Sequence, residues 1–280
     1  MQYHASAGGG FLMVSRLLVV GGDRRAAFLC GLLREDGYIV DTLGIETGDE
    51  KTVRMGEAQA ALFPYPFSVR NGCIPTLNGL TIHPDDVLNT LPAGIPVLHG
   101  RGMEDGMRYE ENTALESRNA EISAEAAVCE AMQRMDRTLM DAKVLVTGYG
   151  LFGRALARKL SALGAEVWAA ARREEQRALA AMNGHHPIAL ERIVEVLPET
   201  HMVLNTIPAQ VLDESALQAM QPGSWLLELA SAPYGFDRDQ AAKLGLNCAV
   251  LPALPARYAP LSAAAALKAA ALQKLSEVKA

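Results

Sequence analysis

The 280-residue chain is poor in aromatic residues, cysteines and basic charge, and each scarcity excludes a class of protein. Its four cysteines are widely separated, with no C-x-x-C pair and no histidine cluster at metal-ligand spacing, so neither a disulfide framework nor a metal site is expected. They predict reduced, buried thiols and a cytoplasmic location. A net charge of −6 argues against nucleic-acid binding. No apolar run approaches the roughly 18–20 residues that span a bilayer, so no membrane segment is expected.

The N-terminal residues carry little structural signal. They lack the basic region and the long apolar region of a signal peptide. Because this stretch is rich in glycine and alanine, residues 1–12 are predicted to form a disordered tail, with Met13 as an alternative start.

What the chain does contain is a regular series of short apolar runs. Half of its residues are hydrophobic, enough for a substantial core. The runs alternate with segments of helical periodicity, a pattern typical of parallel sheets. The predicted strands cover residues 16–20, 39–43, 60–63, 96–99, 143–147, 166–171, 201–205, 224–229 and 247–251.

This pattern predicts an α/β protein with two Rossmann-like, doubly wound parallel-sheet domains, a cleft between them, and a C-terminal helix that packs back on the first domain. A long helical pattern near the middle of the chain predicts a helix bridging the domains, with Met132 and Met135 on its apolar side. Ser262 is the expected N-cap of the last helix. The predicted parts are an N-terminal substrate or catalytic domain (13–118), the bridging helix (119–140), a cofactor domain (141–261) and the C-terminal helix (262–280).

Residues 143–173 read strand, glycine turn, helix, strand, and the turn spells G-x-G-x-x-G. In such a turn the first glycine allows a tight bend, the second lets the backbone approach a pyrophosphate, and the third lets the helix pack closely. The helix N-terminus offers free N–H groups to the phosphates. The predicted phosphate-binding residues are Gly148, Gly150, Leu151, Phe152 and Gly153.

The end of the second strand favours NADP over NAD. An NAD site usually has an acidic residue there, about 20 residues beyond the turn, whereas this chain has Arg172 and Arg173. A guanidinium can pair with the 2′-phosphate of NADP, although two arginines in a loop are also compatible with simple solvation. Gly21 and Gly22 resemble a second nucleotide turn but lack its third glycine, so no second cofactor is expected.

Ligands of open parallel sheets bind at the carboxyl ends of strands, so three further loops should border the nicotinamide. They begin after residues 205, 229 and 251. The remaining predicted cofactor-binding residues lie in the first two or at their edges: Asn205, Thr206, Pro208 and Ala230.

Taken in order, these motifs resemble the A subunit family of dipicolinate synthase from spore-forming bacteria. The resemblance extends over most of the chain and includes Asn119, Glu125, the glycine turn, residues 205–208 and residues 228–231. It implies a bilobal, sporulation-associated oxidoreductase that oxidises dihydrodipicolinate with NADP or NAD as hydride acceptor. It also implies a flavoprotein-like B subunit as partner. A homo-oligomer is expected in addition.

The chain departs from the family pattern at three places. Residues 232–235 read Ala-Pro-Tyr-Gly where the family has Arg-Pro-Gly-Gly, and residues 252–256 read Pro-Ala-Leu-Pro-Ala where it has Pro-Gly-Leu-Pro-Gly. Leu261 replaces a family lysine. Cationic and flexible positions are therefore missing beside the expected substrate, so the chain is a divergent member, uses other cations, or has shifted substrate.

A dicarboxylate substrate requires cations, hydrogen-bond donors and one proton acceptor. Arg257 is the first candidate anchor and Arg70 the second, with Ser231 as a hydrogen-bond donor. Glu125 is a candidate proton acceptor or hinge residue, and His99 and His83 are candidate bases. Each also has an ordinary interpretation as a surface or turn residue.

Two other functions remain open. Shikimate, alanine and 2-hydroxyacid dehydrogenases share a two-lobed plan, but they normally need a Lys–Asp pair or a His-centred dyad, for which the chain has no clear equivalent. Alternatively, the chain is a non-catalytic NADP-binding subunit, which the lost arginine and lysine positions favour.

Overall fold

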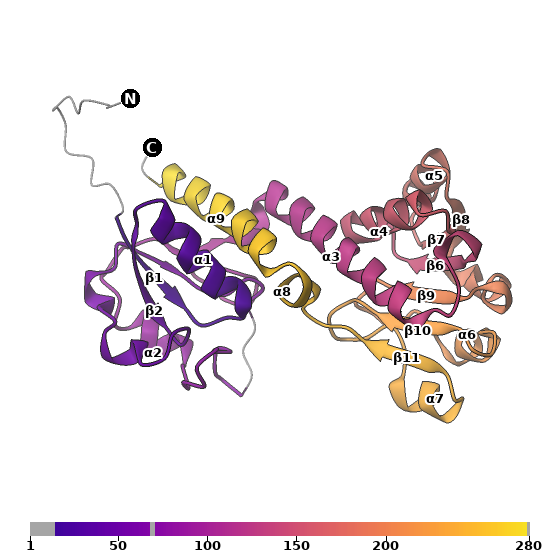
Figure 1. The fold of residues 1–280 in the computed structure, drawn as a ribbon, viewed down its shortest axis with the longest axis horizontal. Coiled ribbons are helices and arrows are strands. Elements are labelled where there is room, and N and C mark those ends of the chain that lie inside the picture. Colours follow the sequence, from indigo (N-terminus) through magenta and orange to yellow (C-terminus); the bar gives the residue numbers. More distant parts are fainter. Residues whose placement is uncertain (1–14, 68–70, 279–280) are drawn as a thin grey trace. The chain divides into compact units, whose positions relative to one another are not determined.

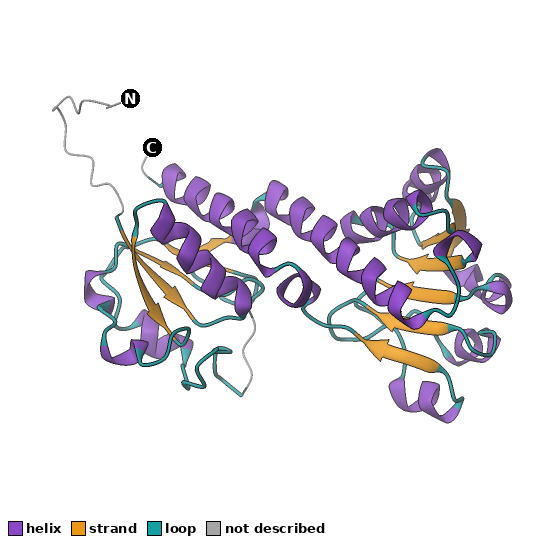
Figure 2. Cartoon of the chain, viewed as in Figure 1, coloured by secondary structure: helices purple, strands orange, loops and turns teal. Residues whose placement is uncertain are grey.

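The computed structural model describes residues 15–67 and 71–278, so the predicted tail and Met13 lie outside the described residues. The chain divides into two compact units, residues 1–112 with 264–280, and residues 113–263 (Figure 1). Both contain parallel sheets flanked by helices, which confirms the predicted fold class of two Rossmann-like domains (Figure 2).

The first unit contains a five-stranded parallel sheet in the order β2-β1-β3-β4-β5. In doubly wound sheets with this strand order, the switch point lies between β1 and β3, because successive strands are added on one side of β1 and then on the other. The strands are β1 (Arg16–Val20), β2 (Ile39–Leu43), β3 (Ala60–Leu62), β4 (Val97–His99) and β5 (Met107–Arg108), and the helices are α1 (Arg24–Glu35) and α2 (Pro84–Leu88).

The C-terminal helix α9 (Pro260–Glu277) packs on the first unit, as predicted. Lys268 Nζ lies 2.7 Å from an Asp36 carboxylate oxygen just beyond α1, and Gln273 accepts a 3.0 Å hydrogen bond from Asn112. The expected N-cap at Ser262 is wrong, because the helix begins two residues earlier at Pro260. Proline suits the first turn, where its missing N–H has no intrahelical partner.

The second unit contains a six-stranded parallel sheet in the order β11-β10-β9-β6-β7-β8. Its order reverses between β6 and β9, the point where doubly wound sheets bind ligands. The strands are β6 (Lys143–Thr147), β7 (Glu166–Ala171), β8 (His186–Ala189), β9 (Met202–Asn205), β10 (Trp225–Glu228) and β11 (Asn247–Val250). The helices are α3 (Thr113–Arg134), α4 (Leu151–Ala162), α5 (Glu174–Met182), α6 (Glu214–Ala219), α7 (Arg238–Lys243) and α8 (Leu254–Tyr258).

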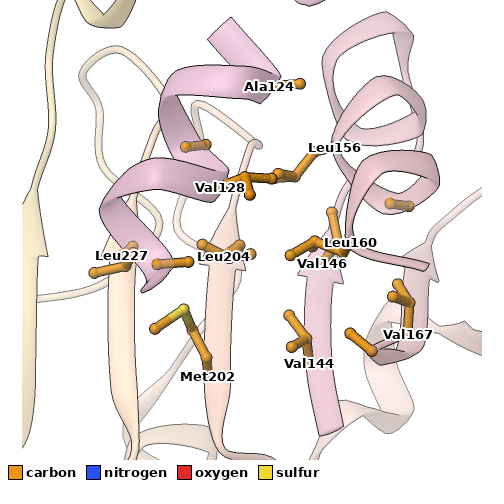
Figure 3. Close-up of a cluster of buried hydrophobic side chains, with 14 of the residues drawn as sticks. Ala124, Val128, Val144, Val146, Leu156, Leu160, Val167, Met202, Leu204 and Leu227 are labelled. Atoms are coloured by element: carbon orange, nitrogen blue, oxygen red, sulfur yellow. The ribbon is translucent and has the colours of Figure 1, made fainter. Parts of the chain in front are cut away.

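Alternation along the strands divides the core of this unit between the two faces of the sheet. Val144 and Val146 point to one face, where Figure 3 shows them below Val128 of α3 and Leu156 of α4. Leu145 points to the other, as the period of two in a strand requires. With both faces covered, the central strands are almost completely buried, which explains their continuous apolar sequences.

The structure corrects several details. Helix α3 ends at Arg134, short of the expected 140, and Met132 is 57% exposed rather than on the buried side. Strand β8 was missed because it contains Pro187, which a strand tolerates at the sheet edge that β8 occupies. Of the cysteines, all free, only Cys30 is buried, and burial raises the pKa of its thiol to about 12.

Across residues 15–67 and 71–278, no helix is long and apolar enough to cross a membrane. Over the same residues, no three His, Cys, Asp or Glu side chains are arranged to hold a metal ion.

Candidate functional site

The glycine turn between β6 and α4 requires glycine at its first and third positions. Gly148 has φ +91°, and a Cβ there would lie 2.5 Å from Thr206 Oγ1. A Cβ on Gly153 would lie 2.0 Å from the Gly148 carbonyl oxygen. The turn is therefore folded tightly on itself and against the end of β9, with no room for a side chain at either position.

The second glycine, Gly150, has open space around it. A Cβ there would meet no atom within 4 Å, and no side chain caps the helix that starts next to it. The first N–H groups of α4, beginning at the half-exposed Leu151, are thus available to a ligand. Free amides and the positive end of a helix dipole fit a phosphate group.

The glycine turn of the first unit is built differently. The Gly21 amide donates to the Leu43 carbonyl at 2.7 Å and the Gly22 amide to the Pro75 carbonyl at 2.6 Å. Helix α1 carries its own cap, because Asp23 Oδ1 accepts a 3.0 Å hydrogen bond from the Arg25 amide. These amides already have partners inside the protein, whereas the turn at Gly150 leaves its own open.

A cavity of ≈ 450 Å³ extends from the Gly150 turn to the ends of β7 and β9. Both Arg172 and Arg173 line it, and both are exposed. The guanidinium of Arg177 fixes the backbone beneath them, since its Nη1 donates to the carbonyls of Ala171 at 3.0 Å and Arg172 at 2.6 Å. Thr206 and Pro208 also line this cavity, opposite the arginines across the turn.

A buried polar network joins the carboxyl ends of β6, β9 and β10. Thr147 Oγ1 donates to Asn205 Oδ1, and Asn205 Nδ2 donates to both carboxylate oxygens of Glu228, at 2.8 and 3.0 Å. The amides of Ala230 and Gly235 donate to the same carboxylate, at 3.0 and 2.7 Å. All the donors of the network are thereby satisfied within the protein.

This network shapes the loop that follows β10. Glu228 is fully buried, which raises the pKa of its carboxyl, while the donors from Gly235, Asn205 and Ala230 act in the opposite direction. A Cβ on Gly235 would lie 2.2 Å from Asn205 Nδ2, so the loop packs directly on the asparagine. The predicted cofactor residues Asn205 and Ala230 thus serve this network, and the Asn205 side chain is enclosed.

Arg257, the first candidate substrate anchor, is partly engaged inside the second unit. Its Nη2 lies 3.1 Å from Oε1 of Glu130 on α3, a carboxylate that also pairs with Arg134 and the Tyr258 hydroxyl. The Arg257 side chain is nevertheless 48% exposed, so the guanidinium also faces solvent.

The other candidate catalytic residues do not gather around one point of this unit. Glu125 lies on the surface of α3 and pairs with Lys159 of α4 at 3.2 Å, and Ser231 is exposed in the loop after β10. His99 belongs to the first unit, is fully buried, and has its Nδ1 2.8 Å from the Gly100 carbonyl oxygen. His83 precedes α2 with its Nδ1 3.1 Å from the Gly72 carbonyl oxygen. Arg70 lies outside the described residues.

Several residues of the site escaped sequence analysis. Glu228 belongs to a segment that carries the resemblance, but its role was not predicted, because its partner Asn205 is distant in the chain. Arg177 acts on backbone carbonyls, which no motif identifies. Tyr149, at a variable position of the G-x-G-x-x-G turn, is buried and its hydroxyl lies 2.7 Å from His185 Nδ1. The only sequence feature that pointed to Tyr149 was its polar side chain between Gly148 and Gly150.

Comparison with known proteins agrees with this geometry. Residues 112–235 match the family model of the D-isomer specific 2-hydroxyacid dehydrogenase, NAD binding domain. This segment of the chain contains the glycine turn and both Arg172 and Arg173. The second unit is therefore a nicotinamide-nucleotide-binding domain, and the chain is NAD(P) dehydrogenase-like.

Three similarities extend over the whole chain. The A subunit of dipicolinate synthase from Bacillus subtilis (strain 168) is 26% identical, over 95% of this chain and 97% of that protein. The crystal structure of the same subunit from Bacillus halodurans has a TM-score of 0.84 at 25% identity, covering 95% of this chain and 99% of that one. The crystal structure of the Bacillus subtilis protein has a TM-score of 0.82 at 24% identity, covering 95% and 97%. In sequence and in fold, the chain is thus similar over nearly its whole length to the A subunit of dipicolinate synthase, and the resemblance inferred from its motifs is confirmed.

Proposed function

We propose that the chain is a dipicolinate synthase A-type oxidoreductase, which oxidises dihydrodipicolinate to dipicolinate with NADP as hydride acceptor and NAD as the alternative. The observation that carries the proposal is the open, uncapped turn at Gly150, located at the switch point of the sheet. The similarity to the A subunit of dipicolinate synthase over 95% of the chain supplies the substrate.

The preference for NADP rests on the end of β7. Arg172 and Arg173 line the cavity there, and no acidic residue occupies the first two positions after the strand. The guanidinium of Arg177 donates to the backbone carbonyl of Arg172, so we assign Arg177 a structural role and not a contact with the nucleotide. We assign the 2′-phosphate to Arg172, with Arg173 beside it.

The reaction makes modest chemical demands on the chain. A nicotinamide nucleotide held at the turn would supply the hydride acceptor, and because the product ring becomes aromatic, the driving force lies in the substrate. The protein must orient the two reactants, hold two carboxylates and remove one proton. Glu228 and Asn205 set the conformation of the loop that presents Ser231, which we propose as a donor to a substrate carboxylate. Arg257 is the proposed bidentate anchor, oriented by its contact with Glu130.

Two groups are proposed for the proton. If Nδ1 of His99 donates to the Gly100 carbonyl, Nε2 carries the free lone pair, and this atom has no hydrogen-bond partner within the described part of the chain. Glu125 is the alternative, with its carboxylate charge balanced by Lys159. The proposed partner is a B subunit, by analogy with dipicolinate synthase, and the proposed assembly of this chain is a homo-oligomer.

One specific observation favours a second function, that of a non-catalytic NADP-binding subunit. Ala232 and Leu261 occupy positions that carry arginine and lysine in the family, and Leu261 is 52% exposed at the start of α9. A third function is that of a dehydrogenase acting on a 2-hydroxyacid. The match of residues 112–235 to the NAD binding domain of 2-hydroxyacid dehydrogenases supports it.

Reconstitution separates the three. The mixture contains pyruvate, aspartate semialdehyde, the upstream condensing enzyme and NADP, with this chain and a B subunit from the same organism added separately and together. Dipicolinate formed only in the presence of this chain is the expected result. Where no product forms, two separate assays decide: nucleotide binding by this chain without any turnover would establish the non-catalytic subunit, and NADPH formation with an added 2-hydroxyacid would establish the third function.

A further inference from the structure

The second residue of the glycine turn has a buried side chain beneath the proposed phosphate site. Tyr149 is 2% exposed, and its ring packs edge-on against His185, with ring centroids 5.7 Å apart and an interplanar angle of 70°. Its hydroxyl oxygen lies 2.7 Å from His185 Nδ1 and accepts a 3.1 Å hydrogen bond from Asn183 Nδ2. The backbone that faces the ligand is thus directly attached to a buried polar cluster.

The donors and acceptors of this cluster are compatible with one protonation state. Asn183 donates to the tyrosine oxygen, so the Tyr149 O–H is free to donate to Nδ1, which must carry a lone pair. The imidazole also makes a hydrogen bond with the backbone of Ala157 in α4. Neutral His185 therefore links the turn to α4 and to the segment that enters β8.

A proton on Nδ1 would end the hydrogen bond that Tyr149 donates. His185 would then donate toward a hydroxyl that already accepts from Asn183, and the Tyr149 proton would lose its buried acceptor. Burial lowers the pKa of His185 below its ordinary value of 6.5 and His186 adds to the effect, while the hydrogen bond with the Ala157 backbone opposes it. Arg154 of α4 acts on the other member of the pair, where it lowers the pKa of Tyr149 against the larger effect of burial, which raises it.

We propose that Tyr149 and His185 are positioning residues of the dinucleotide site, which hold the glycine turn in its phosphate-binding conformation and make cofactor affinity depend on the protonation of His185. The inference rests on the proposed binding of a nicotinamide nucleotide at the turn. Tyr149 belongs to the turn, and His185 contacts it from inside the protein. We assign neither residue a contact with the reacting atoms.

The sign of the pH dependence follows from the direction of the shift. A histidine whose pKa is lowered by folding stabilises the folded state above its ordinary pKa of 6.5, and that stability is lost as the pH falls through the lower folded value. The hydrogen bond to Tyr149 is lost over the same interval. Affinity for the nucleotide should therefore decrease on the acidic side of pH 6.5.

The test compares dissociation constants of NADP and NAD, measured by isothermal titration calorimetry between about pH 5.5 and 8. Tyr149→Phe keeps the ring and removes the hydroxyl, so at pH 8 it should bind about fivefold to tenfold more weakly than the wild type. The ratio of the two constants should fall toward one as the pH decreases below 6.5, because the wild type progressively loses the same bond. Taking the ratio at each pH cancels the titration of the nucleotide's own phosphates.

Two further variants make the result specific. His185→Asn places an amide oxygen near the position of Nδ1, so it should keep most of the affinity at pH 8, and its affinity relative to the wild type should rise as the pH falls. Tyr109→Phe is the matched control, because the Tyr109 hydroxyl is buried without a hydrogen-bond partner in the described residues, and it should leave both nucleotide constants unchanged.

A Tyr149→Phe to wild-type ratio of one at every pH, or one that is constant with pH, would overturn the inference. If Tyr149→Phe does not fold, the ratio of the His185→Asn dissociation constant to that of the wild type decides, and a ratio that does not change with pH counts against the inference. Failure of the wild type to bind either nucleotide would instead refute the proposed cofactor site itself, and with it this inference.

Discussion

The Nη2 atom of Arg257 lies 3.1 Å from Oε1 of Glu130, a buried carboxylate 127 residues away in the chain. The contact ties α8 to α3 and orients a guanidinium that remains half exposed. Arg257 therefore has a structural contact and a free side, and the proposed function assigns the free side to a substrate carboxylate.

Replacing Arg257 with alanine should raise KM for the dicarboxylate about tenfold, since a hydrogen bond to a charged group contributes roughly 1.5–3 kcal/mol. The KM for the nucleotide should change little. Glu130 keeps Arg134 and Tyr258 as partners, so the variant should fold. Steady-state kinetics with each substrate varied in turn checks this, and an unaltered dicarboxylate KM would move the anchor elsewhere.

Substitutions at two glycines of the turn should have different effects, one on cofactor binding and the other on folding. Gly150→Ala meets no atom within 4 Å in the free protein, so its thermal unfolding should match the wild type while its nucleotide affinity falls. Gly153→Ala would place a Cβ 2.0 Å from a backbone oxygen and should cost about 3 kcal/mol of unfolding free energy. Calorimetric melting and nucleotide titration of the two variants check this. Equal nucleotide affinity for Gly150→Ala and wild type would argue against a phosphate at the turn.

One non-glycine residue has a strained backbone. Ala253 has φ +55°, a left-handed conformation that disfavours a side chain. Ala253→Gly should therefore stabilise the protein by about 1 kcal/mol, because relief of strain exceeds the added freedom of the unfolded chain. Ala256→Gly is the control at a nearby alanine. It lies inside α8 and should destabilise by about 1 kcal/mol. Chemical denaturation that shows both variants destabilised would contradict the assigned backbone conformation.

Arg172 should determine nucleotide preference. Arg172→Asp places a carboxylate where an NAD site usually has one, so the variant should lose affinity for NADP by about tenfold or more and gain affinity for NAD. Arg173→Ala is the neighbouring control, with a smaller effect of the same sign on NADP. Titration of both nucleotides into each variant measures this, and an unchanged ratio of affinities in Arg172→Asp would place the 2′-phosphate elsewhere.

The sequence was informative where a short segment determines its own structure. The turn at residues 148–153 and the central strands could be predicted, because glycine spacing and apolar runs act locally. Strand β8 could not, since Pro187 is acceptable only at a sheet edge, a property of the whole sheet. The start of α9 was missed for a local reason, because proline at the first helical position outranked the serine two residues later.

The polar contacts of the candidate site could not be predicted from the sequence, because their partners are far apart in the chain. Asn205 and Glu228 are 23 residues apart, Tyr149 and His185 are 36 apart, and each pair meets only because neighbouring elements bring it together. Composition and spacing identify none of these pairs. The same holds for Glu130, whose burial beside Arg257 changes the expected role of that arginine.

Hydride transfer from dihydrodipicolinate to a nicotinamide nucleotide by this chain can be tested by the stoichiometry of its two products. A limiting amount of NADP would be mixed with excess chain, freshly generated dihydrodipicolinate and a B subunit, and NADPH and dipicolinate would be measured in the same samples. We expect the two products in equal amounts, neither exceeding the nucleotide supplied, with NADPH absent when the chain is omitted. Dipicolinate that accumulates at the same rate without the chain, or without matching NADPH, would contradict the account.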